Sequence, residues 1–186
     1  MLIPLGYLSA SGGSGGAVFE LISTQVLAST ATTVTFSSIP TIYKHLQIRM
    51  TARGAGANTQ DNYRIVLNGD TTATYAYHTM FATGTATNAS AQASTANAYG
   101  PYMPGNSATA NFFGASIIDI LDFANTNKTK TIRHFGGNSA GAGASEVDFY
   151  SNHWNSTAAI TSIQFNLSSG SSYAINSRFS LYGVKG

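Results

Sequence analysis

The acidic residues are the first place to look for catalytic chemistry in this chain of 186 residues. It has seven carboxylates, and a glycosidase needs two of them facing each other across a cleft. Glu146 and Asp148 share one strand face, because residues i and i+2 point to the same side. Asp119 and Asp122 fall on opposite faces unless a turn begins between them. Neither pair predicts an acid/base site, so we expect these to be strand-end and turn carboxylates.

Metal, nucleophile and phosphate motifs are also lacking in the sequence. His45, His78, His134 and His153 stand singly, without the His-x-His or His-Glu-x-x-His spacing of a metal site. The chain has no cysteine, which excludes disulfides and thiolate ligands. No Gly-x-Ser-x-Gly elbow occurs at a strand-turn-helix junction, and residues 12–16 lack the lysine of a phosphate loop. The sequence therefore predicts no enzyme, no metal site and no cofactor.

Aromatic residues are the other candidates for ligand contact, with ten Tyr, ten Phe and one Trp. Tyr75, Tyr77, Tyr99 and Tyr102 lie in or near a long polar stretch. Exposed tyrosines there would stack on sugar rings or become buried at a subunit contact. Trp154 is predicted as a core or rim anchor, with a ligand contact as the alternative. These five residues are our candidate loop contacts, for either a glycan or a protein.

Charge is scarce in this chain. Charged residues make up 9% of it, against roughly 25% in a typical soluble domain. The net charge is +2 and the cations are scattered, which argues against nucleic-acid binding. No run of about 18 apolar residues is present, so we expect no membrane span. A surface rich in Thr, Ser, Asn and Gln suits a protein that is packed in an assembly.

The strand expected at residues 43–54 is the clearest element of the sequence. Leu46, Ile48, Met50 and Ala52 alternate with polar residues, which places an apolar set and a polar set on opposite faces. The apolar set must face a core. This pattern predicts a central strand of an antiparallel sheet.

The remaining segments predict an all-β fold. Further strands are expected at residues 18–27, 32–36, 62–67, 72–81, 112–123, 129–135, 147–154, 160–167 and 179–184. Residues 82–111 are rich in Ala, Thr, Ser, Asn and Gly and predict a long loop with a short strand at 99–103. We therefore expect one antiparallel β-sandwich, most simply a jelly roll, over residues 18–186. The residues predicted for its core are Leu46, Ile48, Met50, Ile65, Ile118, Ile120, Ile163, Phe165 and Leu181.

Residues 1–17 predict an extended N-terminal arm. A Gly/Ser stretch follows an apolar tip and behaves as a flexible tether. The tip either tucks onto its own domain or docks on a neighbouring subunit, and we favour docking. The docking residues would be Leu2, Ile3, Leu5, Tyr7 and Leu8.

Several stretches together resemble a known family. They are Ile3-Pro4-Leu5-Gly6, Ser38-Ile39-Pro40 running into 43–49, Leu67-Asn68-Gly69-Asp70, 118–128, 159–163 and 181–186. The chain resembles small virion structural proteins of tailed bacteriophages. The resemblance implies a β-sandwich on the particle surface, as a head decoration (cement) protein or a tail appendage. No family signature covers residues 82–111, so no binding role is carried over to them.

These observations predict a non-enzymatic virion surface protein. We expect a capsid decoration protein that stabilises the head shell, located in the virion after assembly in the host cytoplasm. Its expected partners are the phage major capsid protein or other virion proteins, and a homo-oligomer, a trimer by preference. The alternative is a tail-fibre or tail-appendage module that binds a host-surface glycan or receptor through its loop aromatics.

Overall fold

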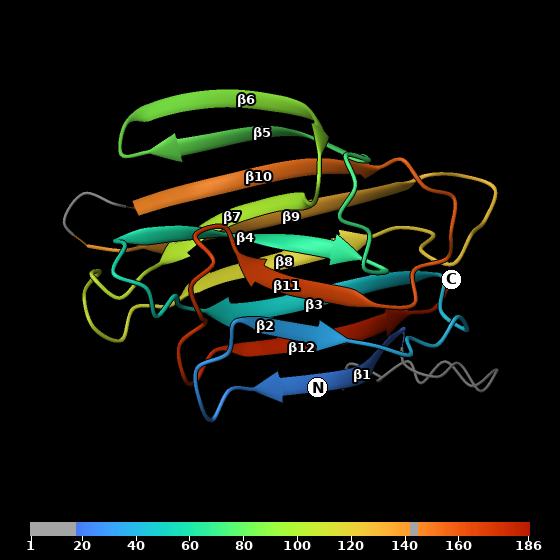
Figure 1. Ribbon diagram of the computed structural model, residues 1–186, viewed down its shortest axis with the longest axis horizontal. Helices are drawn as coiled ribbons and strands as arrows, with labels where there is room; N and C mark the ends of the chain where they lie inside the picture. The colour runs from blue at the N-terminus through green and yellow to red at the C-terminus, as the bar shows by residue number, and fades with distance from the viewer. Residues whose placement is uncertain (1–17, 142–144) are drawn as a thin grey trace, which may run out of the picture.

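The computed structural model describes residues 18–141 and 145–186, where the chain forms two antiparallel sheets packed face to face (Figure 1). The larger sheet has eight strands, in the order β1 (Phe19–Val26), β12 (Arg178–Val184), β3 (His45–Ala52), β8 (Gly114–Ile120), β9 (Lys130–Ser139), β10 (Ser145–Trp154), β5 (Tyr75–Thr83) and β6 (Ala86–Thr95). The smaller sheet has four, in the order β2 (Thr33–Phe36), β11 (Ile163–Leu167), β4 (Gln60–Leu67) and β7 (Ala98–Pro104). The predicted all-β sandwich is confirmed, while the jelly-roll topology stays a prediction.

The core lies between the two sheets and follows the alternation of the sequence. Leu46 and Ile48 of β3 have 0% exposure, whereas Arg49 and Thr51, at the alternating positions that follow, face outward. Each fully buried Leu or Ile contributes roughly 1.5–3 kcal/mol of hydrophobic free energy. The predicted core is confirmed, because all of its members are buried: Leu46, Ile48, Met50, Ile65, Ile118, Ile120, Ile163, Phe165 and Leu181.

A chain of polar groups crosses the core where β9 and β10 face the smaller sheet. The Tyr63 hydroxyl donates to Ser116 Oγ at 3.1 Å and lies 3.1 Å from His134 Nδ1. On the other side of the imidazole, Asn152 Nδ2 lies 3.4 Å from Nε2, and the Asn152 amide also bonds the Tyr99 backbone N–H and C=O. Burial lowers the pKa of His134 to about 3, so the ring is neutral and fits between a donor and an acceptor.

Residues 82–111, predicted as a long loop, form two strands instead. β6 pairs with β5 through a turn at Gly84, whose φ is 57°, and β7 pairs with β4 around the predicted short strand. All residues of β6 except the last are exposed. Its backbone bonds to β5 therefore maintain it as a strand with no buried face, and no apolar alternation could have revealed it.

The two sheets differ in width, and this leaves one margin of the larger sheet uncovered. β7 is the last strand of the smaller sheet and packs over β9 and β10. β5 and β6 extend past it at one end of the molecule (Figure 1). The inner side of this overhang carries Tyr77 and Phe81, both only partly buried. The uncovered margin forms a step between β7 and the overhang.

Candidate functional site

A cleft of about 670 Å³ occupies the step between β7 and the β5–β6 overhang. Its walls come from the inner faces of β5 and β10, from β6, from the edge strand β7, and from the chain leading into β4. The lining residues are Asn58, Thr59, Gln60, Tyr77, Thr79, Phe81, Thr83, Ser90, Tyr102, Glu146 and Tyr150. The lining thus combines aromatic rings, hydroxyl and amide groups, and a single carboxylate.

The carboxylates of the chain fall into two groups. Five have donors among the described residues: Glu20 pairs with Lys185 and Tyr43, Asp61 with Ser168 and Ser169, Asp70 with Thr72, Thr74 and Trp154, Asp119 with Gln47, and Asp122 with Lys128. Glu146 and Asp148 are the other two, and we find no N–H or hydroxyl donor for either among the described residues. The two unpaired carboxylates are neighbours, with Glu146 on the wall of the cleft and Asp148 behind it.

Asp148 is 1% exposed, and burial raises its pKa to about 8, with the Glu146 charge adding to the rise. Neither Asp148 oxygen has a hydrogen-bond partner among the described residues, so no donor offsets the cost of burying a charge there. The Tyr102 backbone opposes the rise, yet its N–H does not reach hydrogen-bonding geometry at either Asp148 oxygen. Near neutral pH Asp148 therefore keeps its proton.

The aromatic residues predicted as loop contacts separate into three places, and all lie on strands. Tyr77 and Tyr102 line the cleft. Tyr99 packs behind Tyr77, with their ring centroids 4.8 Å apart. Tyr75 is 1% exposed, so an exposed contact at this position was a wrong prediction. Trp154 is 2% exposed, which agrees with its predicted role as a core anchor and not with the alternative of a ligand contact.

Tyr75 and Trp154 have a structural task at the turn between β4 and β5. Trp154 Nε1 donates to the Asp70 carboxylate at 2.7 Å, and the Tyr75 hydroxyl donates to the Asp70 carbonyl at 3.1 Å. The two rings stack with centroids 6.1 Å apart. Burial alone would raise the pKa of Asp70, but hydrogen bonds from Thr72 and Trp154 hold it below its usual value. Both rings are therefore committed to the fold.

Sequence reasoning missed the contribution of β10 to the cleft. The spacing of Glu146, Asp148 and Tyr150 puts all three on one strand face, and that signal was visible. What the spacing did not reveal is that this face is covered by β7 and closed by Tyr102. The two carboxyl groups also lie side by side on one strand face, which is not the facing arrangement that a glycosidase needs.

A second unusual surface lies on the opposite, outer face of the larger sheet. Ile117, Phe135, Phe149 and Met80 stand directly opposite one another on β8, β9, β10 and β5. Their exposed fractions lie between 45% and 69%. We call these four residues the apolar row. A strand apolar on both faces predicts burial on both faces, yet β8 buries Ile118 and exposes Ile117.

A shallow groove of about 560 Å³ runs beside the apolar row. Its floor is formed by Thr51, Ala115 and Gly137, which stand opposite one another on β3, β8 and β9. Val147 and Arg178 occupy its two ends in the same register. Small residues flanked by large apolar ones give the outer face relief that a flat sheet lacks.

Arginines give the outer face its charge. Three arginines occupy outward positions of the larger sheet: Arg49, Arg133 and Arg178. On the described strands of this sheet, Asp119 is the single carboxylate that faces outward. The Arg49 guanidinium lies 4.9 Å from the centroid of the Tyr182 ring. This face is therefore apolar with a positive rim.

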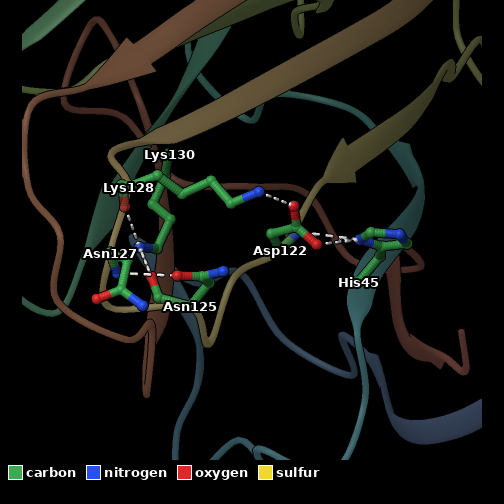
Figure 2. Close-up of polar contacts among 6 residues, drawn as sticks. All are labelled: His45, Asp122, Asn125, Asn127, Lys128 and Lys130. Atoms are coloured by element: carbon green, nitrogen blue, oxygen red, sulfur yellow. Dashed lines mark hydrogen bonds and ion pairs between the residues drawn. The ribbon is translucent and has the colours of Figure 1, made fainter.

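A third cluster of charged groups closes the turn after β8 (Figure 2). Asp122 pairs with Lys128, and the Asp122 backbone N–H donates to His45 Nδ1 at 2.9 Å. The Lys130 side chain has 0% exposure, and its ammonium donates to three backbone carbonyls at 2.6–3.1 Å. Burial lowers the pKa of Lys130. Every charged group here has a partner within the cluster, so we interpret this turn as structural.

The docking-arm prediction lies outside the described residues. Residues 1–17 include all of its members: Leu2, Ile3, Leu5, Tyr7 and Leu8.

Comparison with known proteins assigns no relative to this chain. No family model, curated protein or solved structure matches it. Over residues 18–141 and 145–186, no group of three or more His, Asp or Glu side chains is placed to hold a metal ion. Within the same ranges no helix is long and apolar enough to cross a bilayer.

Proposed function

We propose that the chain is a non-enzymatic surface protein of a tailed-bacteriophage virion, a capsid decoration (cement) protein that stabilises the head shell. Its partners are the major capsid protein or other virion proteins, and it acts as a homo-oligomer, a trimer by preference. The observation that supports this proposal is the apolar row, whose large side chains are exposed on neighbouring strands of the same outer face.

The apolar row is the kind of surface that an assembly partner covers. Contiguous exposed apolar side chains mark interaction sites, because water disfavours them. Covering the half-exposed side chains of the row contributes on the order of a few kcal/mol, against the entropy lost on association. One contact of this size is weak, but repetition over a shell shifts the equilibrium toward the assembled particle.

The positive charge of the outer face limits the kinds of surface that can bind to it. Arg49, Arg133 and Arg178 would repel the same face of a second copy, so a face-to-face dimer is disfavoured. A coat subunit that presents an apolar surface with neutral or acidic surroundings would complement this outer face. The low charge of the whole chain, 9% of residues, is consistent with a protein whose surface is largely covered in a particle.

Particles lacking the protein provide the test. Wild-type protein added back should bind them and raise their resistance to heat and osmotic shock. Phe135→Asp and Phe149→Asp should fold but bind at least about tenfold more weakly, since each places a charge in an apolar contact. Ile42→Asp is the matched control, because Ile42 is 76% exposed outside the row. Full binding of both row variants would refute this role of the outer face.

A tail-fibre or tail-appendage module that binds a host-surface glycan is the second candidate. The cleft favours it, since sugars are bound by aromatic faces together with hydroxyl, amide and carboxylate groups. Loss of a cement protein should leave particles that form but burst early, whereas loss of a receptor binder should leave sturdy particles that fail to adsorb. Heat-stable, non-adsorbing deletion particles would replace the first candidate with the second.

A further inference from the structure

The charge of the cleft is one-sided. None of the residues that line it is a lysine, an arginine or a histidine, while Glu146 lines it and Asp148 stands directly behind. The Arg64 guanidinium lies 4.9 Å from the centroid of the Tyr99 ring, and the other neighbour of that ring is Tyr77 of the lining. A ligand entering the cleft therefore meets negative charge without a compensating cation from the lining.

Aromatic rings surround the same carboxylates. Tyr77 and Tyr150 have their ring centroids 5.8 Å apart and lie on one wall, and Tyr102 faces them from β7. Phe81 stands opposite Asp148 in the β5–β10 register and also lines the cleft. Aromatic faces and a carboxylate together are the chemistry that recognises alkylammonium groups.

We propose that the cleft binds ligands through an ammonium group held between the tyrosines and Glu146. The inference rests on the second candidate function for its biological ligand, and it narrows that ligand to a glycan carrying free amino groups. It also excludes anionic sugars, whose carboxylates would face Glu146 and Asp148 without a cation to pair with.

The buried carboxyl gives this binding a proton signature. An ammonium group beside the two carboxyl groups favours the ionised form of both, so the proton held on the buried Asp148 leaves to solvent when the ligand binds. Affinity should therefore rise with pH up to about pH 8, where the pair becomes ionised without a ligand.

Other titratable groups packed against the pair do not provide this proton. The pKa of His134 on β9 is lowered to about 3, so its ring is neutral throughout the range. The tyrosines facing the pair stay protonated, because burial raises their pKa values. They are Tyr63 on β4, Tyr102 on β7 and Tyr150 on β10. Asp61 on β4 is engaged by serine hydroxyls.

The test uses the full chain and two probes of equal shape. Choline carries a permanent trimethylammonium charge, whereas 3,3-dimethylbutanol has the same outline and none. By calorimetric titration we expect choline to bind about tenfold or more tightly than the alcohol. We also expect choline binding at pH 7 to release protons, seen as a dependence of the heat on the buffer.

Three variants locate the effect. Glu146→Gln should bring choline to within about twofold of the alcohol, and Asp148→Asn should abolish the proton release while leaving some choline preference. Asp119→Asn removes one carboxylate from the outer face and should change neither result. If Glu146→Gln fails to fold, as judged by circular dichroism, Asp148→Asn still tests the proton release. Equal binding of choline and the alcohol, absence of binding by both, or proton release retained in Asp148→Asn would each overturn the inference.

A pair of sugars and one polyamine separate this inference from the glycan function. Glucosamine should bind more tightly than N-acetylglucosamine, and spermidine reports a free polyamine instead of a sugar. Equal binding of the two sugars would keep the glycan function and overturn the ammonium inference. Binding of choline and spermidine with no sugar bound would keep the ammonium inference and remove the glycan function.

Discussion

The apolar row and the cleft are built by opposite faces of the same strand, β10. Val147 and Phe149 point to the outer face, whereas Glu146 and Asp148 point toward the cleft. On the outer face large apolar groups lack a cover, and in the cleft ionisable groups lack a donor. Neither condition lowers the free energy of an isolated fold, so both are readily explained by binding.

The positions of both the apolar row and the cleft residues depend on the register of β10 in the larger sheet. A shift of β10 by one residue would exchange every side chain between the two faces, placing carboxylates outside and valine and phenylalanine in the cleft. Continuous pairing on both sides prevents this, with β9 and β5 each matched to β10 over nearly its whole length. Trp154 fixes one end, through its hydrogen bond to Asp70.

The largest expected effect is the difference between aspartate substitutions at two adjacent positions of β8, one in the core and one on the outer face. Ile118→Asp should abolish soluble expression, because an unpaired buried charge costs several kcal/mol. Ile117→Asp should fold with the wild-type circular dichroism spectrum and lose binding to particles, because its side chain is 45% exposed. Similar loss of folding in both variants would mean that the outer face is part of the core and not a free surface.

Acid should destabilise the cleft side of the sandwich through His134. Its pKa is about 3 in the folded protein and roughly 6.5 when unfolded, so between these values the unfolded state binds one more proton. The free energy of unfolding should then decrease by about 1.4 kcal/mol per pH unit as the pH falls from 6.5 to 3. Urea denaturation of wild type against His134→Gln gives this difference, with His78→Gln on the surface as control.

A rise in pH should destabilise the same region through Asp148, whereas the effect of His134 appears as the pH falls. Its pKa is about 8 when folded and roughly 3.9 when unfolded, so the folded state keeps a proton that the unfolded state releases. The stability contribution is present below pH 4 and is lost as the pH rises to 8. Asp148→Asn should therefore gain stability over wild type progressively across this range, measured by urea denaturation. A constant difference at all pH values would show that Asp148 does not hold the proton.

The smallest expected effect returns to the outer face. Arg49→Ala should lower the free energy of unfolding by about 0.5–1 kcal/mol, the value of an exposed cation–π contact, since the guanidinium stacks on Tyr182. Thermal unfolding at low and high salt gives the measurement. A loss of several kcal/mol would indicate that the rim of this face supports the fold more than the apolar row does.

Much of the sandwich was predictable because alternation reflects burial. The alternation in two strands predicted the burial of their apolar residues, which are Leu46, Ile48 and Met50 in one and Ile118 and Ile120 in the other. β6 escaped prediction because its strand state comes from pairing with β5 alone, which leaves no periodic pattern in its side chains.

The cleft was predictable only in pieces. The shared face of Glu146, Asp148 and Tyr150 follows from spacing, but the burial of Asp148 depends on β7 packing over β10. Tyr102 lies in the short strand predicted at 99–103, but it reaches the cleft only because the smaller sheet ends at β7. The unequal widths of the two sheets are a property of the whole fold, and no local sequence pattern predicts them.

The β5–β6 hairpin has a consequence for engineering. Its tip at residues 83–85 is exposed, and β6 is attached to the body by backbone pairing with one neighbour. Foreign peptides inserted at such a tip leave the core untouched, since exposed loop tips tolerate insertion best. If the protein decorates a shell, each particle would then carry many copies of the inserted epitope, which makes this hairpin a natural choice for vaccine display.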